Sequence, residues 1–186
     1  MKKTYLILYL AVLLLFLFFS MVRSEKARDP YGKLDVVSVV VDQKPNSDKV
    51  VAKVNLLNDE KLTAIIVPLV YGTGKTPITL DSVSFVNTRV EKFVFKYPNI
   101  DKKNQKVNIA LISSLSGANV YLSKGEGEIT RLYFTLKEGA KETSVTLDTT
   151  FFPPSNILQM VEAEVPEVKS ILPGFDNSKG KIMLLK

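Results

Sequence analysis

Two acidic residues, Glu126 and Glu128, stand two positions apart before the apolar stretch ITRLYF. In an extended chain such residues point to the same face, and two carboxylates about 5 to 9.5 Å apart across a cleft form the catalytic unit of glycosidases. Acids at an exposed strand end are ordinary, however. The chain also has no His and no Cys, which removes imidazole bases and thiol nucleophiles. We interpret the pair as a solvated strand entrance and predict that the protein is not an enzyme.

The tripeptide Gly74-Lys75-Thr76 matches the end of the phosphate-loop fingerprint G-x-x-x-x-G-K-[ST]. That loop needs a first glycine and a following helix whose N-terminal amides reach the phosphates. Leu69 stands in place of the first glycine, and the apolar residues from Ile78 to Phe85 are spaced as in an extended chain. The sequence therefore predicts a loop between two strands and no nucleotide cofactor.

A second short motif, DNSKGK at residues 176–181, resembles the start of a calcium-binding loop. Lys179 occupies a ligand position, and no later glutamate completes the set. We interpret this motif as a turn in the tail. The sequence predicts no catalytic residue, no metal ligand and no cofactor, and the residues that bind a partner stay unknown.

Residues 1–24 have the layout of a secretory signal peptide: Lys2 and Lys3 precede an apolar run from Tyr5 to Phe19. Cleavage after Ser24 would release the rest of the chain. Counted through Val22, the apolar run is also at the short limit for spanning a bilayer, so an uncleaved N-terminal anchor is the alternative. We expect an extracytoplasmic protein, whether secreted, periplasmic or on the cell surface, that meets a membrane only through residues 1–24.

The remaining sequence predicts a short linker at 25–33 and one domain at 34–186. With no Cys, the domain has no disulfides and must be stabilised by an apolar core. Loss of Lys2, Lys3 and Arg23 with the signal peptide lowers the formal net charge from +6 to +3. This weak and scattered positive charge gives no indication of nucleic-acid binding.

The domain reads as a succession of short strands rich in β-branched and aromatic residues. Eight stretches have this pattern: LDVVSVVVDQ, KVVAKVNLLN, LTAIIVPLVY, ITLDSVSF, VEKFVFKYP, KVNIALISS, GEITRLYFTL and ETSVTLDTT. Their turn-rich connections predict an all-β antiparallel sandwich or jelly roll of about nine strands. Pro68 should lie at an edge or a bulge, and residues 113–122 are the one candidate for a helical turn. Residues 180–184 form a last strand or a fraying tail.

Exposed aromatic rings would favour a sugar-binding face. Phe93, Phe95 and Tyr97 alternate, so in a strand they share one face, and Lys92, Val94 and Lys96 share the other. With the lysines in solvent, we predict that the aromatic row packs in the core, and that a ligand platform is the alternative. Better candidates for exposed rings are Tyr71, Tyr121 and Tyr133. The absence of Trp weakens a sugar platform.

Two further clusters are interpreted as structural. Lys102, Lys103 and Lys106 crowd one turn, which is typical of a solubilising hairpin tip, with an acidic partner as the alternative. Phe151-Phe152-Pro153-Pro154 is a stiff apolar corner that we expect to close the sandwich rather than to dock a partner.

Several of these stretches together resemble the cohesin-like domains of secreted bacterial proteins. DVVSVVVDQ is followed by VVAKVNLLND, which resembles the family pattern V-x-V-x-L-x-N, and then by LTAIIVPLVYG, TLDSVSF and the glycine-led KGEGEITRLYFTLK. The resemblance spans residues 34–150. One departure is Gly72, which stands where many members have an acidic or amide residue.

The resemblance implies a jelly-roll sandwich that acts as a non-catalytic binding or assembly module. Its partner would be a dockerin-like protein module or a polysaccharide. A flat polar or mixed sheet face would favour protein docking, and an exposed aromatic row would favour a glycan. Alternatives outside this class are a structural envelope protein anchored by residues 1–24 and, least favoured, a glycosidase.

Overall fold

The computed structural model describes residues 27–114, 120–163 and 170–186, and all regular elements in these ranges are β-strands. One sheet has the order β12 (Gly174–Lys179), β1 (Val36–Gln43), β2 (Lys49–Asn58), β7 (Gly125–Leu136) and β4 (Ile78–Ser84). The second has the order β11 (Ser170–Ile171), β10 (Gln159–Glu162), β3 (Leu62–Val70), β6 (Lys106–Ile112) and β5 (Phe95–Asp101), with β9 (Asp148–Thr149) beside β3. A short pair joins β8 (Ser144–Thr146) to β13 (Lys181–Met183).

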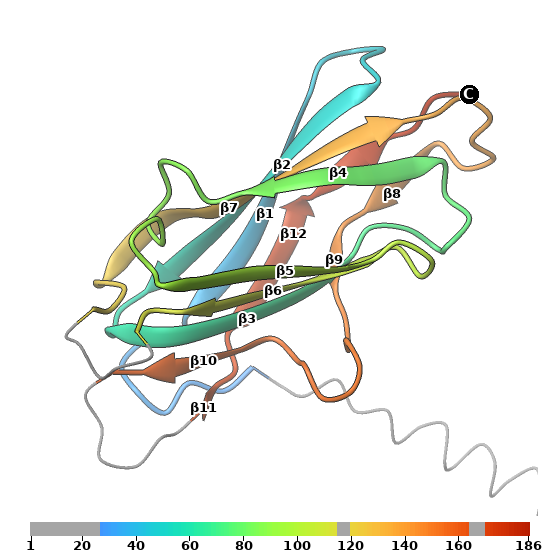
Figure 1. Cartoon of the computed structure of the whole chain (residues 1–186). Helices are drawn as coiled ribbons and strands as arrows, with labels where there is room; N and C mark the ends of the chain where they lie inside the picture. The colour runs from blue at the N-terminus through green and yellow to red at the C-terminus, as the bar shows by residue number, and fades with distance from the viewer. Residues whose placement is uncertain (1–26, 115–119, 164–169) are drawn as a thin grey trace, which may run out of the picture.

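The two sheets stack as the layers of a sandwich (Figure 1). Period-two alternation builds the core: in β2, Val50, Ala52, Val54 and Leu56 are buried, while the side chains between them face outward. The second sheet contributes its own buried set from β3, β6 and β10: Ile65, Val67, Leu69, Val107, Ile109, Leu111 and Met160. The antiparallel β-sandwich predicted from the sequence is therefore confirmed.

The C-terminal segment contributes more than the sequence indicates. The predicted last strand is present as β13 at residues 181–183, and it is preceded by β12, which pairs in parallel with β1 from Val36↔Gly174. The described residues hold thirteen strand segments rather than about nine. The motif DNSKGK is therefore not a simple tail turn, because its first four residues belong to β12.

The fifth strand lies further along the chain than predicted. The predicted stretch VEKFVFKYP covers residues 90–98, but β5 extends to Asp101, whereas residues 90–93 form a turn before it. Lys96 points inward, and its Nζ donates to the backbone oxygens of Glu91 (2.8 Å) and Phe93 (2.5 Å). The prediction of an aromatic core row is therefore wrong for Phe95 and Tyr97, which point outward. Lys96 can take the inward position because its stem lies over apolar surface while its amine reaches polar groups.

Pro68 lies on a central strand, so the prediction of an edge or bulge is wrong. It pairs with Asn108 of β6 on one side, in a register without a bulge. Its carbonyl oxygen accepts from Thr150 N on the other side, where β10 has ended and β9 begins. The missing amide donor is tolerated because it faces this break between two short strands.

Segments outside the main strands lie against the sandwich. Arg28 and Leu172 exchange backbone hydrogen bonds, and so do Leu62 and Leu122. Half of the helical turn expected at 113–122 lies outside the described residues, and its described residues are not helical. The segment 1–24 also lies outside the described residues. Among the residues that the structure describes, no helix is long and apolar enough to cross a membrane.

Candidate functional site

The outward face of β5, β6, β3 and β10 carries apolar side chains in register. Strand pairing aligns Phe95, Ile112, Ala64 and Val161 in one row across four strands. The next row holds Tyr97, Ala110, Ile66 and Gln159, and a third holds Asn99, Asn108 and Pro68. We call these three rows the apolar face.

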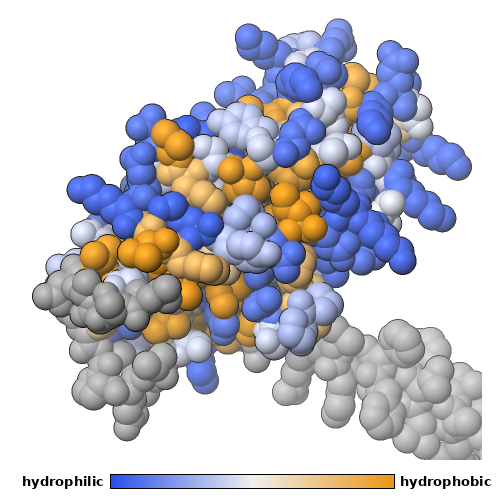
Figure 2. All heavy atoms as spheres, in the orientation of Figure 1, coloured by the Kyte–Doolittle hydropathy of each residue, from blue (hydrophilic) through white to orange (hydrophobic). Residues whose placement is uncertain are grey.

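The two aromatic rings are the most prominent part of the apolar face. Phe95 is 37% exposed and Tyr97 is 53% exposed, and their ring centroids are 6.0 Å apart. Phe93, by contrast, is 3% exposed and packs in the core. Figure 2 shows apolar side chains gathered on the side of the molecule where β5, β6 and β3 lie. Exposed apolar patches of this kind mark interaction surfaces in soluble proteins.

The outward face of the other sheet has a different character. Val40, Lys53 and Arg131 form one of its rows, and Ser38, Asn55 and Glu128 form another. Lys49 Nζ and Asp81 Oδ2 both hydrogen-bond Thr135 Oγ1 on the same face. This face therefore mixes charged and polar groups that pair with one another and apolar side chains such as Val36, Val40 and Leu57, of which Leu57 is 46% exposed.

A polar acceptor and a cationic rim border the apolar face. Asn108 is 4% exposed, and its Oδ1 has no hydrogen-bond partner among the described residues. Lys102 and Lys103 are exposed in the turn between β5 and β6, next to Asp101. The third row of the apolar face is therefore polar at two positions, Asn99, which is exposed, and Asn108, which is buried.

The two acids singled out in the sequence lie near the start of β7. Glu126 is exposed. Glu128 Oε1 is 2.6 Å from Arg131 Nε, with which it forms an ion pair. Their place at the beginning of the strand agrees with the interpretation of a strand entrance.

The loop that contains Gly74-Lys75-Thr76 connects two strands, as predicted, and β4 follows it in place of a helix. Gln105 fills the space where a phosphate would lie: its Oε1 accepts from the amides of Gly74 (2.9 Å) and Thr76 (3.2 Å). Gly72 leaves room for this side chain, because a Cβ at residue 72 would overlap Gln105 Oε1. The loop amides are therefore already satisfied within the protein.

The remaining candidate aromatic residues divide between core and surface. Tyr71 is 1% exposed and packs on Phe134, with ring centroids 5.4 Å apart, so its prediction as an exposed ring is wrong. Tyr121 is 37% exposed. The corner at 151–154 is split, since Phe152 is buried as expected while Phe151 is exposed.

Comparisons with known proteins identify the fold. No protein-family model matches the sequence, and no curated protein matches it. Solved structures do match: the seventh ScaB type I cohesin from Pseudobacteroides cellulosolvens has a TM-score of 0.62 at 14% identity, covering 81% of this chain and 92% of that chain. The OlpA cohesin from Clostridium thermocellum, solved in complex with a dockerin, has a TM-score of 0.64 at 10% identity, with coverage of 82% and 100%.

A non-cellulosomal cohesin from the archaeon Archaeoglobus fulgidus also matches, with a TM-score of 0.54 at 11% identity and coverage of 83% and 93%. The chain therefore has a cohesin-like fold, as the sequence resemblance implied. At these identities the likeness identifies the architecture, and function has to be argued from the surface of this chain.

Proposed function

We propose that the protein is a non-catalytic binding module that docks a protein partner on its apolar face. The observation that supports this most directly is the alignment of Phe95, Ile112, Ala64 and Val161 across four strands. A flat surface of aliphatic and aromatic side chains with a polar rim has the composition of a protein–protein interface core. Within the similar fold, the OlpA cohesin is found in complex with a dockerin, so a dockerin-like module is the partner class that we propose.

The site of action follows from the N-terminal sequence. Residues 1–24 would direct export or anchor the chain, residues 25–33 would link, and residues 34–186 would form the binding domain. Together with the cohesin-like fold, this arrangement supports an extracytoplasmic module that recruits its partner to the cell surface or the medium.

A glycan is the second candidate partner, and the exposed pair of Phe95 and Tyr97 is the observation that favours it. Sugar recognition requires hydrogen-bonding groups beside the rings as well as stacking surfaces. The direct partners of Phe95 and Tyr97 across the strands are Ile112 and Ala110, whose side chains offer none. The polar residues of the face, Gln159, Asn99 and Asn108, lie on β10 or in the third row. We therefore place the protein partner first.

The test is a capture experiment with the full chain, immobilised through a C-terminal tag and exposed to the envelope and secreted fractions of the native organism. Retained proteins are identified by mass spectrometry, and the affinity for a recovered partner is measured by calorimetry. We expect one stoichiometric protein, bound at least about 10-fold more weakly by Tyr97→Ala, because an aromatic anchor in an interface contributes about 2 kcal/mol or more.

The matched control is Tyr133→Ala, which removes the same side chain from the outward face of the other sheet. It should leave the affinity unchanged. Equal loss in both variants, or no loss in either, would reject the apolar face as the docking surface. Retention of polysaccharide alone, weakened by Tyr97→Ala, would establish the glycan reading instead.

A further inference from the structure

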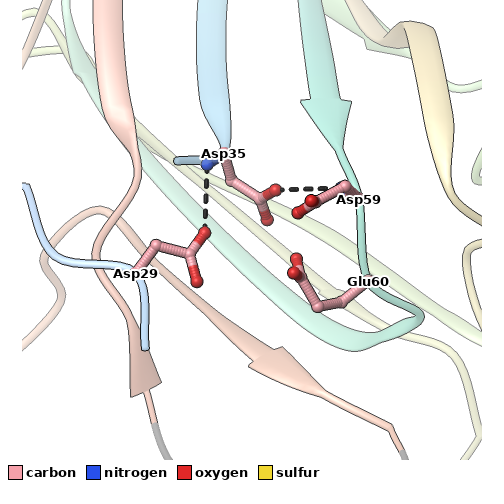
Figure 3. Close-up of side chains that lie close together, drawn as sticks. All are labelled: Asp29, Asp35, Asp59 and Glu60. Atoms are coloured by element: carbon pink, nitrogen blue, oxygen red, sulfur yellow. Dashed lines mark hydrogen bonds between the residues drawn. The ribbon is translucent and has the colours of Figure 1, made fainter. Parts of the chain in front are cut away.

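Four carboxyl groups converge at one end of the sandwich. Asp29, Asp35, Asp59 and Glu60 each offer an oxygen, and these oxygens all lie within 4.8 Å of one another. Figure 3 shows the four side chains pointing toward a common centre from three parts of the chain. We call this group the acidic cluster.

The sequence positions the acidic cluster from both sheets. Asp29 belongs to the segment before β1, Asp35 immediately precedes β1, and Asp59 and Glu60 form the turn between β2 and β3. β2 and β3 lie in different sheets. The cluster therefore joins the N-terminal segment to the turn where the chain crosses from one layer to the other.

Backbone amides hold the outer oxygens of the acidic cluster. Asp29 accepts from the amides of Tyr31 (2.9 Å) and Asp35 (3.0 Å). Asp35 Oδ1 accepts from Asp59 N (3.2 Å), and Asp59 Oδ2 accepts from Lys33 N (2.9 Å). These bonds fix three of the four carboxylates in place through one oxygen or both.

The inner oxygens have no partner outside the acidic cluster. Asp35 is 1% exposed and Glu60 is 8% exposed. Within the described residues, no donor from outside the cluster reaches the buried atoms Asp35 Oδ2, Asp59 Oδ1 and Glu60 Oε2. A buried carboxylate oxygen without a donor or cation is costly, so three of them around one point indicate that a positively charged group is missing.

The segment at Gly32 packs closely over the acidic cluster, and the positive charges of Lys124 and Arg89 act on Asp59 and Asp35. Gly32, at φ +53°, passes over the cluster, and a Cβ there would overlap Asp59 Oδ2 and crowd Glu60 Oε1. The ion pairs Lys53–Asp42 and Arg131–Glu128 both lie elsewhere.

We propose that the acidic cluster is a calcium-binding site formed by Asp29, Asp35, Asp59 and Glu60. Carboxylate oxygens are the ligands of hard divalent cations. Calcium binds oxygens at about 2.3 to 2.6 Å, so two ligands on opposite sides of the ion are at most about 5 Å apart, which accommodates the 4.8 Å spread of this cluster. Magnesium requires shorter distances of about 2.1 Å and near-ideal octahedral geometry, and we expect it to bind more weakly.

The bound ion would fasten the N-terminal segment to the turn between β2 and β3. It would neutralise charges that otherwise repel one another across two layers of the fold. This role is independent of the apolar face, because none of the four ligands belongs to β5, β6, β3 or β10.

The test compares thermal unfolding of the full chain, kept in mild detergent and stripped with EDTA, before and after addition of calcium chloride or magnesium chloride. When free calcium is about 100 times its dissociation constant, we expect the Tm to rise by about 5 to 10 °C. The double variant Asp35→Asn/Glu60→Gln should lose this rise. Its Tm without metal should exceed that of the stripped wild type, because the change removes the repulsion.

A double variant at exposed acids outside the cluster, Asp42→Asn/Glu126→Gln, makes the same change in charge and should keep the full calcium response. Terbium luminescence excited through tyrosine provides a second measurement on the unmodified chain, and calcium should displace the signal. Absence of both a calcium-dependent Tm shift and terbium binding in the wild type would overturn the proposal. So would an unchanged calcium response in the Asp35→Asn/Glu60→Gln variant.

Discussion

The side chain of Glu60 illustrates how a single residue makes the stability of this fold depend on pH. Burial, the hydrogen bond with the carboxyl group of Asp59 and the charge of Asp35 raise the pKa of Glu60 from 4.5 to about 8. Burial raises the pKa of Asp35 from 3.8 to about 6. The pKa of Asp59 is lowered, chiefly by its hydrogen bond with Glu60, and affects stability only at more acidic pH.

We therefore expect metal-free protein to lose stability as the pH rises from about 4 to about 8. In this interval the folded chain binds protons that the unfolded chain has released, so the free energy of unfolding falls as the pH rises. Urea unfolding in EDTA at pH 5 and pH 8 measures the change. Glu60→Gln should flatten the slope, whereas Glu126→Gln should leave it as in the wild type; a slope of the opposite sign would contradict the buried-carboxyl account.

At the residue scale, the sequence does not reveal the acidic cluster. Its members are separated by up to 31 positions and are brought together by contacts between distant segments. The one local signal is Asp35, a charged residue directly before an apolar strand. Phe95 and Tyr97 were misplaced for a related reason: alternation shows which residues share a face, but not which face is buried when a lysine can reach around an edge strand.

At the scale of elements, the loop between β3 and β4 depends on a side chain from another hairpin. Gln105 is 5% exposed, accepts from the amides of Gly74 and Thr76, and donates to the carbonyl oxygens of Thr76 (2.7 Å) and Ile78 (3.0 Å). This single amide group therefore replaces the backbone pairing that the loop lacks.

We expect Gln105→Ala to destabilise the protein by about 2 to 4 kcal/mol, because it leaves several buried backbone groups without partners. Chemical denaturation followed by circular dichroism gives the change in the free energy of unfolding. Lys103→Ala, in the same turn but exposed, should change it by less than about 0.5 kcal/mol. A similar small change for Gln105→Ala would show that water can replace its hydrogen bonds.

A strand could be predicted from the sequence where apolar and polar residues alternate clearly along it. β2 has the bounds expected from KVVAKVNLLN, since its apolar residues recur at every second position on the buried face. β12, with the sequence GFDNSK, has no such pattern. It is held to β1 by backbone hydrogen bonds. Such bonds can form with almost any side chains, so the spacing of apolar residues did not predict this strand.

At the scale of the whole molecule, the C-terminal residues complete the sandwich. Ile182 is fully buried and Leu184 is 8% exposed, and β13 pairs with β8. Residues after Gly180 thus pack in a core whose other side chains come from strands much earlier in the sequence.

Ile182→Ala should therefore cost about 2 to 5 kcal/mol of stability, as expected for a cavity in a packed core. Its neighbour Met183 is 52% exposed, and Met183→Ala should be close to neutral. Thermal and urea unfolding of the two variants tests the difference. Equal, small effects of the two substitutions would mean that the C-terminal residues contribute little to the stability of the domain.

The parallel pairing of β1 with β12 has a mechanical consequence. The chain runs from the N-terminal segment into β1 and from β12 into β13, and β1 and β12 run in the same direction. Once β13 is pulled away from β8, tension between the two ends would slide β1 and β12 along each other and strain the hydrogen bonds of their ladder together, instead of opening them one by one. A tether at one end and a load at the other would thus act on this ladder in shear.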